Sequence, residues 1–181
     1  MEINLLKNYP KTKRDLKKRS FKTKEHQEIA RQFDKEFFDG SRDTGYGGFK
    51  YDKRFWDLVV QDFIKFYDLN ENSSILDIGC GKGFMLYDFS RYLPHAKLKG
   101  LDISKYAIKN SLNEIKDSLI EGDCKSLPFK DDEFDLVISI NTIHNHDLED
   151  CAKSINEIER VSKKNSFIVV DAYNSEEERE S

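Results

Sequence analysis

The hydrophobic and polar positions of this 181-residue chain predict helices that alternate with short buried strands. Apolar residues three and four positions apart predict helices at about 25–38, 54–67, 82–92, 104–115 and 148–162. Short apolar runs predict strands at 75–78, 97–103, near Leu119, 134–141 and 166–173. Strands separated by helices pair in parallel through right-handed crossovers, so we expect an α/β fold with a doubly wound, mostly parallel sheet.

The N-terminal third of the chain has a different character from the rest. The helix over 25–38 carries a stripe of aromatic side chains, and residues 40–49 contain four glycines, which predicts a loop. The helix over 54–67 is expected to bury Phe55, Leu58, Val59, Phe63 and Ile64. We therefore predict two regions. Residues 1–52 form a basic arm, a helix and a lid loop rich in glycine and aromatic residues, and residues 53–181 form the ligand-binding domain.

The most informative segment is residues 75–83, where an apolar strand runs into three glycines at alternate positions and then into a helix. Glycine lets the backbone turn sharply and lets a ligand approach it closely, so the segment predicts a cofactor loop. A dinucleotide fingerprint needs glycine where Phe84 stands, and a phosphate-binding loop needs Ser or Thr where Gly83 follows Gly81-Lys82. What remains is an acidic residue followed by three alternate glycines, from Asp77 to Gly83.

Three later segments continue the pattern. Residues 98–104 (LKGLDIS) read as a second strand that ends in Asp102, residues 118–124 (SLIEGDC) as a third, and residues 127–139 (LPFKDDEFDLVIS) as a turn and a fourth. By its spacing, Asp102 is expected to accept hydrogen bonds from both hydroxyls of a ribose. The alternative is that Asp102 only caps the helix that begins near Ser104.

In this order the motifs resemble those of the class I S-adenosylmethionine-dependent methyltransferases. The resemblance implies a Rossmann-like sheet of order 3-2-1-4-5 and the cofactor S-adenosyl-L-methionine. It also implies that Asp123 accepts from the adenine amine, that the Cys124 N–H meets a ring nitrogen, and that Asn141 lies beside the methionine part. The residues expected to bind the cofactor are Asp77, Gly79, Cys80, Gly81, Gly83, Phe84, Asp102, Ile103, Asp123, Cys124, Asn141 and Thr142.

Methyl transfer from a sulfonium is an in-line displacement that needs alignment and no metal ion. An acceptor that must lose a proton needs a base, and the end of the fourth strand offers two histidines, a residue type that titrates near neutral pH. We expect His144 to be this base, with His146 second; the alternative is a loop histidine that only bonds backbone. The residues expected to close over the site or to bind substrate are Arg42, Tyr46, Tyr51, Arg54 and Trp56.

The acceptor is less specified. Nucleic-acid amino-methylases carry a Pro-Pro-aromatic turn where this chain has Asn141-Thr142-Ile143, which argues against nucleic acid as the partner. The segments GYGG, RFW, LDIGCGKGFML and NTIHN are similar to small methyltransferases of bacterial surface-polysaccharide biosynthesis. That resemblance implies a small anionic acceptor, such as a sugar nucleotide or a phosphorylated metabolite, which Arg42, Lys50 or Arg54 would bind. A nucleic-acid methyltransferase and a noncatalytic cofactor-binding partner subunit remain alternatives.

Composition adds three expectations. The net charge is only −4, but residues 1–24 hold nine basic and two acidic side chains, which is typical of a solvated arm or an anion-binding patch. No apolar run approaches the roughly 18 residues of a membrane span, and no signal peptide is evident, so we expect a cytoplasmic protein. Cys80, Cys124 and Cys151 are odd in number and widely spaced, which predicts reduced thiols and no metal site.

The resembled family adds a sixth and a seventh strand. We expect these 181 residues to form a sheet without them, either as a piece of a longer chain or because the protein naturally lacks them. The apolar run 167–170 would then form an uncovered sheet edge, and such edges pair readily with other chains. We expect the N-terminal segment or a second copy of the chain, in a homodimer, to cover it.

Overall fold

The computed structural model describes residues 4–10 and 23–170. Most of the predicted basic arm, at 11–22, and the last part of the predicted fifth strand, at 171–173, lie outside the described residues.

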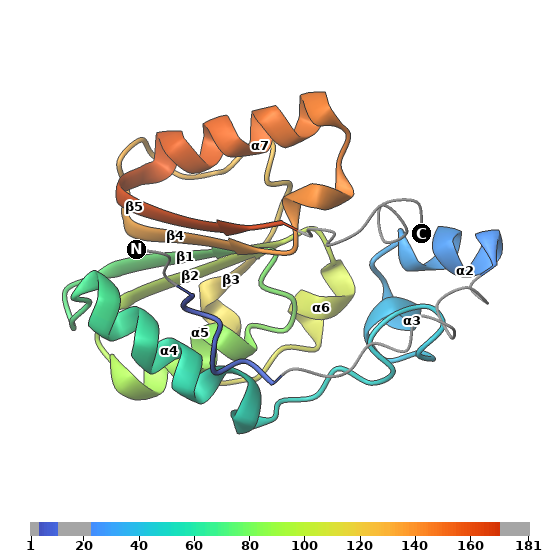
Figure 1. The fold of residues 1–181 in the computed structure, drawn as a ribbon, viewed down its shortest axis with the longest axis horizontal. Coiled ribbons are helices and arrows are strands. Elements are labelled where there is room, and N and C mark those ends of the chain that lie inside the picture. Colours follow the sequence, from blue (N-terminus) through green and yellow to red (C-terminus); the bar gives the residue numbers. More distant parts are fainter. Residues whose placement is uncertain (1–3, 11–22, 171–181) are drawn as a thin grey trace.

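A single parallel sheet forms the centre of the molecule (Figure 1). Its strands are β1 (Ser74–Ile78), β2 (Lys97–Asp102), β3 (Leu119–Glu121), β4 (Phe134–Ile140) and β5 (Ser162–Val169). They lie in the order β3-β2-β1-β4-β5, with every neighbouring pair parallel. The predicted fold class and strand order are therefore confirmed.

Helices cover both faces of this sheet. The helices α4 (Lys53–Tyr67), α5 (Phe84–Tyr92) and α6 (Lys105–Lys109) lie on one side, and α7 (Leu148–Val161) lies on the other (Figure 1). Alternate residues of β4 serve the two layers: Leu136 and Ile138 pack with α4 and α5, whereas Val137 packs with Ile158 of α7. Because both faces are covered at the centre of the sheet, the central strand β4 (FDLVISI) reads as a nearly continuous apolar run in the sequence.

The α4 helix follows the prediction in length but not in every buried position. It begins after Asp52, whose side chain accepts from the Arg54 N–H. Leu58, predicted to be buried, is 54% exposed, whereas Val60 is fully buried. One helical residue turns the side chain by about 100°, so the step from Leu58 to Val59 crosses from the solvent face to the core face.

The predicted helix over 25–38 is broken in two, into α2 (Lys24–Ala30) and α3 (Lys35–Phe38). The break is at Phe33, whose φ of 48° is left-handed and incompatible with a continuous helix. This turn redirects α3, so that Phe38 is only 3% exposed and Phe33 packs edge-on to Phe37.

Other predicted boundaries shift for local reasons. The helix expected to reach residue 115 ends at Lys109, where the Asn110 and Ser111 side chains donate to the last carbonyls, those of Tyr106 and Ile108, and so cap the helix end. A short 3₁₀ helix, η1 (Lys116–Ser118), follows. The α5 helix begins at Phe84 and not at 82, and β5 begins at Ser162, directly after α7.

Within the described residues, β5 pairs with β4 alone. Residues 4–10 do not cover its free edge. They pack beside α4 instead, where Leu5 is 6% exposed in the core and the Asn8 side chain donates to Asp62 Oδ2 at 2.8 Å. Residues 4–10 therefore do not supply the cover, the rest of the N-terminal segment lies outside the described residues, and pairing with a second copy stays a prediction.

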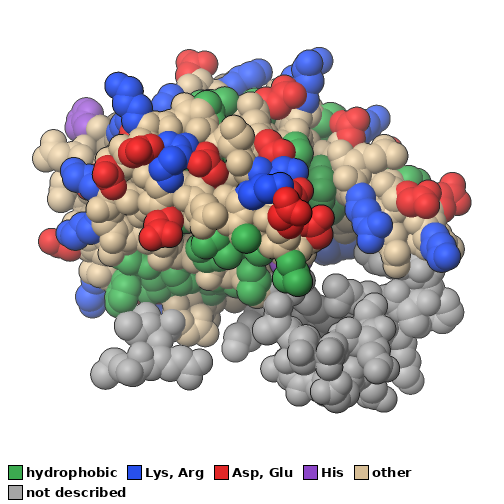
Figure 2. All heavy atoms as spheres, turned by 90° about the horizontal axis from the view of Figure 1, so that it is seen from above, with side chains coloured by type: hydrophobic (Ala, Val, Ile, Leu, Met, Phe, Trp, Pro, Cys, Tyr) green, Lys and Arg blue, Asp and Glu red, His purple; other side chains and the backbone are tan. Residues whose placement is uncertain are grey.

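The outer surface over α7 is highly charged. Acidic and basic side chains are interspersed on the face shown in Figure 2, and Lys153 of α7 pairs with both Glu149 and Asp150. None of the helices in the described ranges is both long and apolar enough to cross a bilayer.

Candidate functional site

A cavity of about 270 Å³ lies at the carboxyl ends of β1, β2, β3 and β4. Ligands of open parallel sheets bind in this position, outside the strand ends where the chain order reverses. Its wall has three parts: loops that follow the strands, aromatic residues between 33 and 56, and two residues of the N-terminal segment. The lining residues from the strand ends and the helices after them are Asp77, Gly79, Cys80, Gly81, Phe84, Met85, Leu101, Asp102, Ile103, Gly122, Asp123, Cys124, Ile140, Asn141, Thr142, Asn145 and His146.

The glycine loop needs its glycines for shape. Gly79, Gly81 and Gly83 have φ angles of 76°, 55° and 75°, a region that other residues rarely adopt. A Cβ on Gly79 would overlap the Thr142 side chain, and a Cβ on Gly83 would lie 2.8 Å from Leu119 Cδ1. Gly83 was predicted to contact the ligand, but it does not line the cavity. Its lack of a side chain instead lets the loop pack against Leu119 of β3.

The backbone amides of this loop are already engaged within the protein. The Gly79 N–H donates to the Leu101 carbonyl at 2.7 Å, the Gly81 N–H donates to Asp102 Oδ2 at 2.7 Å, and the Gly83 N–H donates to the Cys80 carbonyl at 2.9 Å. The loop is thereby fixed before any ligand binds. It presents a closely approachable backbone surface and not a row of free donors.

Asp102 ends β2 and is only 8% exposed. Its Oδ2 accepts from Gly81 and its Oδ1 accepts from the Ser104 N–H at 2.8 Å, while Ser104 Oγ itself caps α6 by accepting from Ala107. Burial raises the pKa of Asp102, and the two backbone hydrogen bonds act in the opposite direction. Each carboxylate oxygen can accept about two hydrogen bonds, so each retains one acceptor position for a ligand.

Two further carboxylates face the cavity. Asp77, in β1, is 7% exposed, and burial together with the nearby charge of Asp102 raises its pKa to about 7. Asp123 follows β3, and its Oδ1 accepts from the Lys125 N–H at 2.9 Å. No lysine or arginine belongs to the described residues that line the cavity. The electrostatics of the wall therefore favour a ligand that carries positive charge.

Residues 33–51, which we call the lid, close the cavity with aromatic rings. The Tyr46 and Phe49 ring centroids are 4.3 Å apart, and Phe49 lies 4.8 Å from Phe84 at the start of α5. A Cβ on Gly81 would lie 3.1 Å from the Phe49 ring, so the lid rests directly on the glycine loop. Phe33, Phe37 and Phe38 also line the cavity.

An ion pair fastens the lid to the glycine loop. Lys82 Nζ, in a side chain 7% exposed, contacts Asp39 Oδ1 and Oδ2 at 2.8 and 2.7 Å and donates to the Phe49 carbonyl at 2.9 Å. The Tyr106 hydroxyl and the Phe49 N–H also donate to Asp39. Burial raises the pKa of Asp39, but the hydrogen bonds from Lys82 and Tyr106 outweigh it and hold this pKa below its usual value. The lysine of the glycine loop thus binds a carboxylate of the lid.

The structure separates the five predicted lid or substrate residues. Tyr46 and Trp56 line the cavity, whereas Arg42, Tyr51 and Arg54 do not. Arg54 is exposed and pairs with Asp52 at 2.9 Å. The Tyr51 hydroxyl donates at 2.6 Å to Oδ1 of the fully buried Asp88, and burial together with this carboxylate raises the pKa of Tyr51 to about 12. Tyr51 therefore anchors the end of the lid to α5.

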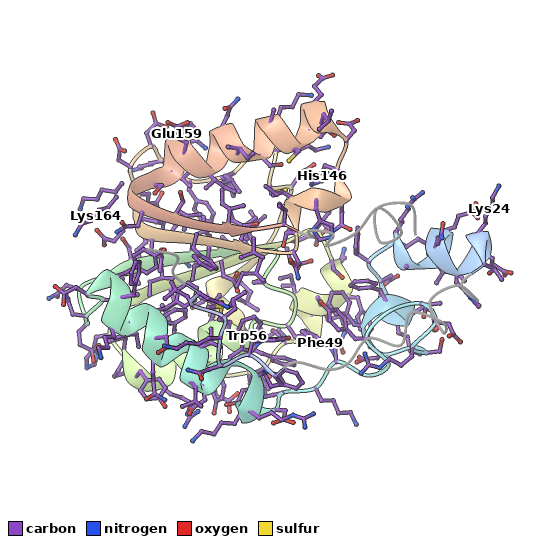
Figure 3. The ribbon with its side chains drawn as sticks, in the orientation of Figure 1. Lys24, Phe49, Trp56, His146, Glu159 and Lys164 are labelled. Atoms are coloured by element: carbon purple, nitrogen blue, oxygen red, sulfur yellow. The ribbon has the colours of Figure 1, made fainter. Side chains whose placement is uncertain are left out.

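The two predicted histidines also separate. His146 lines the cavity, whereas His144, on the short 3₁₀ helix η2 (Ile143–Asn145), does not. His146 lies on the α7 side of the strand ends, with Phe49 and Trp56 across from it on the α4 side (Figure 3). Its Nε2 is 3.3 Å from Cys124 Sγ, and Cys124 Sγ is 3.4 Å from Ser154 Oγ of α7. Cys80 and Cys124 are buried and Cys151 is half-buried, and all three are free thiols.

Sequence reasoning missed part of the wall. Leu6 and Tyr9 line the cavity, with the Tyr9 ring 4.8 Å from Trp56, and no local pattern marks these N-terminal residues. The aromatic stripe at helical spacing did indicate Phe37 and Phe38, although as core or lid packing. The described residues contain no cluster of three or more His, Cys, Asp or Glu side chains suited to a metal ion.

The sequence model described as a methyltransferase domain matches residues 69–180. The chain is 30% identical over 121 residues to the uncharacterized methyltransferase YcgJ of Bacillus subtilis, covering 63% of this chain and 46% of that protein. It is 32% identical over 105 residues to the mouse mitochondrial arginine-hydroxylase NDUFAF5 (57% and 30%), and 32% identical over 114 residues to the sterol 4-C-methyltransferase strm-1 of Caenorhabditis elegans (58% and 32%). The chain thus spans less than half the length of these curated relatives.

Solved structures show the same fold. A protein of Methanococcus maripaludis described as an S-adenosyl-L-methionine-dependent methyltransferase superposes with a TM-score of 0.56 at 21% identity, over 69% of this chain and 59% of that one. The [4+2]-cyclase SpnF superposes with a TM-score of 0.52 at 21% identity, over 59% and 41%. At such identities the likeness extends to the fold alone.

Proposed function

The chain belongs to the methyltransferase domain family, and we propose that its cavity binds S-adenosyl-L-methionine and directs the methyl group to a small, uncharged acceptor. The observation that carries the proposal is the set of carboxylates Asp77, Asp102 and Asp123 at three successive strand ends, on a wall whose described residues include no lysine or arginine. The cofactor carries a sulfonium and an ammonium group, so its charge is complementary to this wall.

The chemistry of the wall fits the cofactor. The two acceptor positions left on Asp102 match the two hydroxyls of a ribose. Asp123 is placed beyond Asp102 along the sheet, where it would accept from the adenine amine, with Ile103 beside it as an apolar contact. Asp77 lies at the other end, where it would face a cationic group of the methionine part.

The protein's own contribution to the reaction is alignment, exclusion of water and removal of a proton. When bound, the cofactor supplies an electrophilic methyl group. The lid rings would hold water away from it, and Asn141 and Thr142 at the end of β4 would border the acceptor. His146, and not His144, is the histidine on the wall, so we assign the base to His146.

The wall argues for an uncharged and largely apolar acceptor. The anionic acceptor predicted from the sequence would need a cation, but Arg42, Lys50 and Arg54 are not among the residues that line the cavity. A phosphate on the acceptor would meet no lysine or arginine among the described residues of the wall. A relative named for an apolar acceptor, the sterol methyltransferase strm-1, is consistent with this choice. The similarity to enzymes of surface-polysaccharide biosynthesis stays a prediction.

Two alternative functions would each give a distinct experimental result. A nucleic-acid methyltransferase would use the lysines of residues 11–22, outside the described part of the chain, and its binding would fall steeply with salt. A noncatalytic partner subunit would bind the cofactor and transfer nothing. The hydroxylase name of one relative shows that fold and family do not fix the chemistry.

The test is calorimetric titration with S-adenosylhomocysteine, followed by transfer of labelled methyl groups to neutral and phosphorylated acceptors. We expect saturable binding that weakens about 10- to 100-fold in Asp102→Asn, because a hydrogen bond to a charged group is worth about 1.5–3 kcal/mol. Asp117→Asn, on an exposed carboxylate away from the cavity, is the control. Absence of binding by the wild-type chain, with a nucleotide bound instead, would overturn the assignment.

A further inference from the structure

A chain of hydrogen bonds runs from α7 to the cavity, and its direction can be worked out from its buried end. Ser154, which is fully buried, donates its hydroxyl proton to the Asp150 carbonyl at 2.9 Å. A carbonyl oxygen can only accept, so this end of the chain has a single possible direction. The single proton of the Ser154 hydroxyl is therefore engaged with the Asp150 carbonyl and is not free for a second hydrogen bond.

The next contact, Cys124 Sγ to Ser154 Oγ at 3.4 Å, then needs its proton from the thiol. Burial raises the pKa of Cys124, which keeps the thiol protonated and able to donate. With its S–H directed at Ser154, the sulfur can serve His146 only as an acceptor. The 3.3 Å contact between His146 Nε2 and Cys124 Sγ is thus an N–H donating to sulfur.

We propose that Ser154 and Cys124 are positioning residues that fix the neutral His146 imidazole in the tautomer protonated on Nε2. A neutral imidazole carries one N–H, so Nδ1 is left as the nitrogen that can take up a proton. The geometry thereby selects the nitrogen of His146 that acts as base, which no local sequence signal indicates.

The inference rests on the proposed function and adds to it the path of the acceptor proton during methyl transfer. The bond between the methyl carbon and sulfur breaks with its electron pair on sulfur, a lone pair of the acceptor forms the new bond to carbon, and the acceptor proton passes to His146 Nδ1. The imidazolium that results keeps its Nε2–H directed at Cys124. Protonation therefore leaves every hydrogen bond of the chain in place, whereas the opposite tautomer has no basic nitrogen free of the thiol.

The tautomer can be measured without cofactor by long-range ¹H–¹⁵N correlation spectra of the ¹⁵N-histidine-labelled protein. The chain has four histidines, and His146→Gln identifies the signal of interest. We expect the Nε2–H tautomer in the wild type. Ser154→Ala removes the thiol's acceptor, so the S–H turns to Nε2 and the tautomer shifts to Nδ1–H. Cys124→Ser, which keeps one donor and one acceptor at the same place, retains the wild-type pattern, and Cys151→Ser on the same helix is the control.

The same variants separate this inference from the proposed function. If the Nδ1–H tautomer rises from about a tenth to nine-tenths in Ser154→Ala, kcat falls about tenfold at an unchanged KM for the cofactor, whereas the control Cys151→Ser keeps the wild-type kcat. A wild-type His146 in the Nδ1–H form, or a tautomer insensitive to Ser154→Ala, would overturn the inference whatever the transfer assay gives. Failure to bind S-adenosylhomocysteine, with the expected tautomers, would overturn the proposed function alone.

Discussion

Replacement of Asp77 by Asn should make the ligand-free protein more stable at alkaline pH while it weakens the site. Burial and the charge of Asp102 raise the pKa of Asp77 to about 7 from an ordinary 3.8. At about 1.4 kcal/mol per pKa unit, ionising this carboxyl in the folded chain costs on the order of 4 kcal/mol more than in the unfolded chain. Asparagine has the same shape and does not ionise.

The sign follows from which state holds the proton more tightly. The pKa of Asp77 is higher in the folded protein, so its stabilising contribution is fully present below about pH 4 and is lost as the pH rises through about 7. The free energy of unfolding of the wild type should therefore fall by up to about 4 kcal/mol over this range relative to Asp77→Asn. For a chain of this size that corresponds to roughly 2–4 °C in Tm per kcal/mol.

Denaturant and thermal unfolding of both proteins between pH 4 and 8.5 measure the difference directly. Asp117→Asn, which removes an exposed carboxylate, should run parallel to the wild type at every pH. Parallel curves for the wild type and Asp77→Asn across pH 4–8.5 would refute the reasoning, because they would mean that Asp77 ionises as easily in the fold as in water.

Binding should respond in the opposite direction. A cationic ligand needs ionised Asp77, which is about one-tenth populated at pH 6 and about nine-tenths at pH 8 if the pKa is about 7. Calorimetric affinity for S-adenosyl-L-methionine should rise about tenfold between these pH values in the wild type and stay flat in Asp77→Asn. An equal affinity at both pH values in the wild type would show that no positive charge lies beside this carboxylate.

Two further predictions concern the loop and the lid. Gly79→Ala should abolish cofactor binding and lower Tm by several degrees, because its Cβ meets the Thr142 side chain. Gly48→Ala, also at positive φ but with open space around it, should lose only about 1 kcal/mol of stability through backbone strain. Calorimetry and thermal unfolding compare the two variants. Lys82→Met should cost about 1.5–3 kcal/mol by removing the cation from Asp39, which keeps its hydrogen bonds from Tyr106 and Phe49, and should speed hydrogen exchange in the lid. The added change Asp39→Leu should restore part of the stability. Unchanged lid exchange in Lys82→Met would contradict the role given to the ion pair.

Local patterns predicted the sheet and its binding edge, because each depends on residues close together in sequence. The three glycines after β1 and the carboxylate that ends β2 sit at fixed offsets from apolar runs, and parallel pairing then brings their loops to one edge. Strand order was available only through the family resemblance. The break at Phe33 was not predictable from spacing, because the aromatic stripe continues through it with helical periodicity.

The interactions that complete the site join residues far apart in sequence, and this is why sequence reasoning missed them. Asp39 and Lys82 are 43 positions apart, and Cys124 and Ser154 are 30 apart. From the sequence, Lys82 was only a loop residue whose neighbours do not match a phosphate-binding motif. Cys124 was predicted to contact adenine through its backbone N–H. The choice between His144 and His146 likewise depends on the turn η2: His144 lies within it and does not line the cavity, whereas His146 directly follows it and does.

Trp56 is the only tryptophan of the chain, and it forms part of the cavity wall in contact with Tyr9. The intrinsic tryptophan fluorescence of the protein therefore comes from this one position. A small molecule that enters the cavity displaces water from the indole or quenches it, and so changes the signal. The protein carries its own optical probe of occupancy, so titrations and stopped-flow measurements of ligand entry need neither a label nor an acceptor.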